Sequence, residues 1–146
     1  MEITALRRRL KITIEASSKQ VLSTDEMGSL FPKGTWVYLT DVGIDPLETI
    51  IAAAAKLRAC GYVPVPHIPA RRIKSAEALD LRIARLSAEA DVDNVLLIAG
   101  EADRQMGPYS ASIEILRSDI LNRHAIRRIA VAGHPEGSTV MSVDMV

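Results

Sequence analysis

The sequence predicts an α/β fold of parallel βα repeats, because short apolar segments recur along it at the spacing of such a repeat. The segments begin about 25 to 35 residues apart, and several of the intervals have the apolar periodicity of a helix. Aromatic residues make up only 3% of the chain, so Ala, Ile, Leu and Val must build the core. The expected strands are 12–14, 36–39, 62–65, 95–98 and 129–132.

Capping residues predict where two helices begin. Pro46 suits a first helical position, with Asp45 as N-cap, Glu48 in the first turn and Gly61 just beyond the helix end. The segment 23–26 offers a capping box for a shorter helix after the first strand.

Helical spacing predicts two more helices. One begins near Ser75 and carries a stripe of Leu79, Ile83, Leu86 and Ala90. Another begins near residue 109 or 110, with Ile113, Leu116 and Ile120 on one face. Because helices alternate with strands, we expect parallel strands joined by right-handed crossovers.

Two prolines interrupt the third expected strand. Pro64 and Pro66 have no amide hydrogen to donate to a neighbouring strand. We expect Pro66 to lie at the strand end, where the chain leaves the sheet, while Pro64 conflicts with a central strand.

Length and composition indicate one globular domain, 1–146. Hydrophobic residues make up 48% and charged residues 25% of the 146 residues, which excludes a disordered chain. No composition change marks a boundary. No apolar run approaches the roughly 18 residues of a membrane span, and no apolar segment follows the basic N-terminal residues as in a secretory signal.

Charge and cysteine content bear on partners and location. The formal net charge is zero, which favours neither nucleic acid nor a membrane surface as a partner. The single cysteine, Cys60, cannot form an internal disulfide, so a reducing, cytoplasmic location is expected.

Several catalytic motifs are missing from the sequence. It has no phosphate-binding P-loop, no dinucleotide-binding glycine motif, no zinc-protease motif and no serine nucleophile elbow. The three histidines lie apart from Cys60, so no metal site is expected. Arg71 and Arg72 follow the third strand, where they could meet an anionic ligand or form structural ion pairs.

Polar residues follow the expected strands at their carboxyl ends, where parallel α/β proteins place their functional sites. They are Glu15, Thr40 with Asp41, His67, Glu101 after Gly100, and His134 with Glu136.

Four segments resemble the strands of methylenetetrahydrofolate reductases. The segment 61–68, Gly-Tyr-Val-Pro-Val-Pro-His-Ile, resembles that family's third-strand motif. The segments 94–101 and 131–137 resemble its fourth and fifth strands, and 37–41 lies where the family has a strand ending in threonine. The order and spacing agree from about residue 11 to 137.

The resemblance implies an FAD-dependent (β/α)8 barrel that uses NADH or NADPH to reduce 5,10-methylenetetrahydrofolate to 5-methyltetrahydrofolate. Glu15 would be the general acid that protonates the folate, a role that burial of the carboxyl would favour. The residues matching FAD-binding positions are Thr40, His67, Glu101, Ala132 and His134. Glu101 would place negative charge near the flavin pyrimidine edge.

The sequence also departs from the family pattern. Ala99 stands where the family has arginine, Glu101 replaces aspartate and His134 replaces tyrosine. A complete barrel needs roughly 200 residues or more, so we expect a partial (β/α)8 barrel of five strands that binds FAD weakly or not at all. The alternatives are a non-catalytic truncated barrel and an open doubly wound α/β sheet that binds a ligand or a protein.

A partial barrel predicts self-association. Its two edge strands would expose unpaired backbone groups, and zero net charge does not oppose contact between copies. Residues 140–146 alternate apolar and polar side chains as a strand does. We expect a homodimer or higher oligomer with this tail as a sixth strand; the alternative is a disordered tail.

Overall fold

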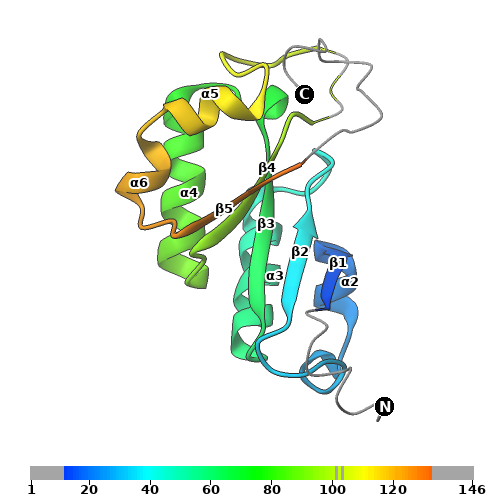
Figure 1. Cartoon of the computed structure of the whole chain (residues 1–146). Helices are drawn as coiled ribbons and strands as arrows, with labels where there is room; N and C mark the ends of the chain where they lie inside the picture. Colours follow the sequence, from blue (N-terminus) through cyan, green and yellow to red (C-terminus); the bar gives the residue numbers. More distant parts are fainter. Residues whose placement is uncertain (1–11, 101, 103, 133–146) are drawn as a thin grey trace, which may run out of the picture.

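Five parallel strands form one sheet in the order of the chain, β1-β2-β3-β4-β5 (Figure 1). The computed structural model describes residues 12–100, 102 and 104–132. The strands are β1 (Thr13–Ser17), β2 (Trp36–Thr40), β3 (Val63–Pro69), β4 (Asn94–Ile98) and β5 (Arg128–Val131). The predicted α/β class, with parallel strands linked through helices, is therefore confirmed.

The helices pack as one layer, behind the strands in Figure 1. They are α2 (Ser18–Ser23), α3 (Leu47–Ala59), α4 (Ala76–Ala90), α5 (Ser112–Arg117) and α6 (Ile120–Arg123), with short 3-10 helices η1 (Met27–Ser29) and η2 (Ala70–Arg72). Within this layer α2 contacts α3, α3 contacts α4, and α4 contacts α6. The described residues place no helix on the opposite face of the sheet.

The core lies between the sheet and this helical layer. Every second residue of the central strands points into it: Val37, Leu39, Ile68, Val95 and Leu97. The helices contribute the fully buried side chains Ile50, Leu57, Leu79, Ile83 and Leu86. Burying one such side chain stabilises the fold by about 1.5–3 kcal/mol, so this interface holds the sheet and the helices together.

The two prolines of β3 lie where they interrupt no pairing. The amide of Val63 donates to the carbonyl of Thr35, so this residue turns its backbone groups toward β2. By alternation, Pro64 and Pro66 face β4, and the pairing of β3 with β4 begins only at His67. Neither proline therefore removes a ladder hydrogen bond. The expectation that the strand ends at Pro66 was wrong, because β3 continues past it.

The two long helices largely follow the expectations. All four residues of the predicted stripe on α4 are buried, and Ser75 is its N-cap. Gly61, with φ of 80°, follows α3 in the left-handed conformation expected after a helix end. Asp45, however, is not the N-cap of α3: Pro46 takes that position without a side-chain hydrogen bond, and the helix begins at Leu47.

The short helices differ more from the expectations. A capping box between Ser17 and Gln20 begins α2, so Ser23 ends a helix rather than starting one. The third predicted helix divides into α5 and α6, because Ser118 adopts extended backbone with ψ of 144°. Of its predicted apolar face, Ile120 is buried as expected, but Ile113 and Leu116 are exposed. Ile115 and Leu121 are buried instead.

No helix in the described part of the chain is both long and apolar enough to cross a membrane.

Candidate functional site

The sheet face without helices gathers polar side chains from neighbouring strands; we call it the open face. Glu15 of β1 pairs with Tyr38 of β2, and His67 of β3 pairs with Leu96 of β4. These residues alternate with the strand residues that enter the helical core, so their side chains lie on the open face. Thr40, which ends β2 and pairs with Ser17, lies on the same face.

His67 is the most buried ionisable residue on the open face. It is 8% exposed, and its ring lies 6.4 Å from that of Tyr38 in an edge-to-face arrangement. Burial lowers the pKa of His67, while the negative charges of Glu15 and Asp41 raise it in part. The imidazole is therefore neutral near pH 7, and its buried Nε2 atom has no hydrogen-bond partner among the described residues.

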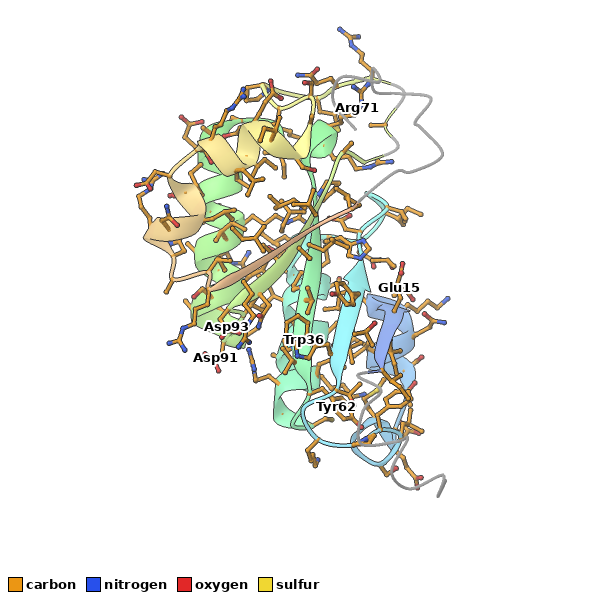
Figure 2. The ribbon with its side chains drawn as sticks, in the orientation of Figure 1. Glu15, Trp36, Tyr62, Arg71, Asp91 and Asp93 are labelled. Carbon is orange, nitrogen blue, oxygen red and sulfur yellow. The ribbon has the colours of Figure 1, made fainter. Side chains whose placement is uncertain are left out.

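Glu15 lies on an edge strand of the sheet (Figure 2). Its carboxylate is exposed, yet its charge acts on the buried imidazole of His67. We expected Glu15 to be buried, but the described residues leave it exposed. The reason is its position on β1, which pairs with β2 alone among the described strands.

Asp41 follows β2 but has a structural partner. Its carboxylate forms an ion pair with Arg82 of α4, and the two side chains are 5% and 12% exposed. Its Oδ1 atom also accepts a hydrogen bond of 2.8 Å from the amide of Gly43. Asp41 thus fixes the end of β2 to the helical layer, and Thr40 remains the polar group of this strand on the open face.

Arg71 also makes structural contacts. Its side chain donates from Nε and Nη2 to the carbonyl of Ala102, at 3.2 and 3.1 Å. Its backbone amide donates to Ala99, and its carbonyl accepts from Met106. Of the two roles left open for Arg71, the described contacts show the structural one: it holds the segment after β4 against η2.

Three of the expected site residues come together on the open face, namely Glu15, Thr40 and His67. Ala132 follows β5, and its amide donates to the carbonyl of Leu97. Glu101 and His134 lie outside the described residues, so their predicted place beside His67 stays a prediction.

Sequence reasoning missed three residues near the amino ends of the strands. Asn94 is 1% exposed; its amide nitrogen donates to Asp93, and its Oδ1 atom has no partner among the described residues. The guanidinium of Arg128 lies 5.6 Å from the ring centre of Trp36. The sequence signal for Asn94 was an amide at the start of an otherwise apolar strand.

The side chains of Trp36 and Arg128 contact each other across the open face. Trp36 belongs to β2 and Arg128 to β5, with two strands between them. Three strand spacings amount to about 14 Å in a flat sheet. The two long side chains therefore reach toward each other across β3 and β4 on the open face.

Among the described residues, no group of three or more His, Cys, Asp and Glu side chains could hold a metal ion. A comparison of the sequence with models of known protein families finds no match.

Proposed function

We propose that the open face binds a flavin and that this chain is a methylenetetrahydrofolate reductase-like protein of one-carbon metabolism. The reaction is the reduction of 5,10-methylenetetrahydrofolate to 5-methyltetrahydrofolate, with NADH or NADPH as reductant. The observation that carries the proposal is His67, a buried neutral imidazole whose Nε2 has no hydrogen-bond partner among the described residues. It lies on a face that also carries Glu15 and Thr40.

The surroundings of His67 fit a flat ligand with hydrogen-bonding edges. A buried nitrogen without a partner destabilises a protein by about 1–3 kcal/mol, and a ligand atom that bonds to it recovers this energy. A flavin ring has such nitrogen and oxygen atoms along its edge. The open face offers the ring a surface that extends from β2 to β5.

The fold supports this proposal through the order of its strands. A parallel sheet in chain order with its helices in one layer is the arrangement of a (β/α) barrel segment. We therefore infer a five-stranded part of a (β/α)8 barrel whose interior is the open face. We also place the protein in the cytoplasm, where Cys60 stays reduced.

The residues would have distinct roles. When bound, the flavin supplies hydride transfer between the nicotinamide and the folate. His67 and Thr40 orient the flavin from β3 and β2. Glu15 takes the role of general acid toward the folate nitrogen, and its exposed position leaves it accessible to a substrate lying over the face.

Titration with FAD, followed by the change in flavin fluorescence, tests the binding step. The native chain should bind weakly, and His67→Ala should weaken binding at least tenfold, about 1.4 kcal/mol. His124→Ala is the matched control, because His124 bonds to Asp80 of α4 on the helical side. Absence of binding at millimolar FAD, or equal losses in both variants, would overturn the proposal.

The catalytic step needs its own test. Glu15→Gln should retain FAD binding and lose reduction of 5,10-methylenetetrahydrofolate. If the native chain binds FAD but shows no turnover with NADH or NADPH, the non-catalytic alternative holds and the reductase proposal fails.

A further inference from the structure

We propose that Tyr38 is a positioning residue of the open-face site: its ring fixes the plane of the His67 imidazole, so that Nε2 can bond to a ligand lying over the face. The part of this inference that concerns the ligand rests on the function proposed above. The part that concerns His67 does not, because it follows from the contact between the two rings.

Tyr38 lies between the two ionisable side chains of the open face. Its Cα atom on β2 pairs with that of Glu15 on β1 and with that of Val65 on β3. His67 follows Val65 by two residues on β3, so its side chain lies on the same face, diagonally across from Tyr38. The ring of Tyr38 therefore stands beside His67, with Glu15 on its other side.

The rings of Tyr38 and His67 are close enough to restrict each other. Their centres lie 6.4 Å apart, and their planes are inclined by 68°, which is the edge-to-face geometry that aromatic rings favour. The Nε2 atom has no hydrogen-bond partner among the described residues to hold the imidazole in place. Because the torsion that turns an imidazole about its bond to Cβ is broad, the ring contact limits the direction in which Nε2 points.

The Tyr38 ring also helps to bury the imidazole. His67 is 8% exposed, and this burial lowers its pKa against the opposing charges of Glu15 on β1 and Asp41 at the end of β2. Tyr38 contacts the imidazole from the side of β2. Without its ring, water would reach the imidazole, and the pKa of His67 would rise toward its ordinary value.

Substitutions separate the Tyr38 ring from its hydroxyl group. Tyr38→Phe keeps the ring, whereas Tyr38→Leu and Tyr38→Ile each replace it with an aliphatic side chain. Tyr38 lies outside the cluster of core residues, so all three variants should fold, which circular dichroism checks. Trp36→Leu is the matched control, because Trp36 lies on the same strand, two residues earlier, and its ring contacts Arg128.

Proton NMR of the imidazole, assigned by its absence in His67→Gln, measures the pKa of His67 in each variant. Tyr38→Phe and Trp36→Leu should titrate as the native chain does. Tyr38→Leu and Tyr38→Ile should titrate at higher pH, closer to the ordinary value of 6.5. A native titration in both aliphatic variants, or an equal displacement in Tyr38→Phe or Trp36→Leu, would overturn the proposal.

Titration with FAD tests the part that concerns the ligand. Tyr38→Leu should weaken FAD binding about tenfold, and Tyr38→Phe should keep the native affinity. If the native chain does not bind FAD, the proposed function fails, while the NMR titration still decides whether Tyr38 positions His67. If FAD binds equally well to the native chain and to Tyr38→Leu, flavin binding stands and the role of Tyr38 toward the ligand is overturned.

Discussion

The side chain of His67 is buried and uncharged near pH 7. Its Nε2 atom has no hydrogen-bond partner among the described residues. Its place in β3 removes it from water, while Glu15 on β1, two strands away, and Asp41 at the end of the neighbouring β2 act on it. Burial disfavours the imidazolium more than these charges favour it, so the pKa is lowered. The Nε2 atom of an uncharged, desolvated imidazole can either donate or accept a hydrogen bond, depending on the tautomer.

The lowered pKa predicts a loss of stability in acid. Because the folded chain holds the His67 proton less tightly than the unfolded chain, this contribution is complete above the unfolded value of 6.5 and is lost as the pH falls through the folded pKa. The slope from this one group is at most about 1.4 kcal/mol per pH unit. Urea unfolding between about pH 7.5 and pH 5 should show a flatter profile for His67→Gln than for the native chain. Identical profiles would contradict the assignment.

At the scale of elements, α4 forms two ion pairs that differ in how far they are exposed to water. Asp41, at the end of β2, pairs with Arg82 of α4 in a nearly buried contact, with side chains 5% and 12% exposed. Glu48 of α3 pairs with Arg85 of α4, and its side chain is 68% exposed. Water screens the second pair, so only the first should matter for stability.

Removing one partner from each pair tests this difference. Asp41→Asn leaves the guanidinium of Arg82 buried without its countercharge and should lower the free energy of unfolding by about 3 kcal/mol. Glu48→Gln is the matched control and should change it little. Chemical denaturation of the three proteins measures both values, and equal effects would refute the role given to Asp41.

At the scale of the whole molecule, one hydrophobic core extends from α2 to the segment before β5. The cluster of buried hydrophobic residues runs from Val21 of α2 to Ile126 before β5 and includes all the long helices. The helix α2 contacts α3, α3 contacts α4 and α4 contacts α6. Each central strand contributes to the same interface. Among the described residues, no segment forms a separate hydrophobic core.

A single core predicts a single unfolding transition. The fluorescence of Trp36, the one tryptophan of the sequence, reports on β2, whereas far-ultraviolet circular dichroism reports mainly on α3 and α4. At one protein concentration, the two signals should change at the same urea concentration. Separate midpoints would show that the sheet and the helical layer unfold independently.

The sequence by itself determined the α/β class, the five strands and the two long helices. These elements follow from local rules: apolar runs of strand length, the stripe on α4, and the glycine after α3. The helix after the first strand was placed wrongly, and the helix predicted after β4 divides into α5 and α6. Short helices depend on capping and on tertiary contacts more than on periodicity. The sequence also pointed to Glu15, Thr40 and His67, since polar residues near strand ends follow from the same local pattern.

Tertiary structure alone decided which of these residues share a face and what surrounds them. It turned the backbone of Pro64 and Pro66 toward β4, before the pairing of β3 with β4 begins. It also paired Asp41 with Arg82 and left Glu15 exposed on an edge strand. These outcomes depend on strand order and register, which bring together residues distant in the chain. No local pattern encodes such distances, and for that reason the burial of His67 and the contact of Trp36 with Arg128 emerge only in the folded sheet.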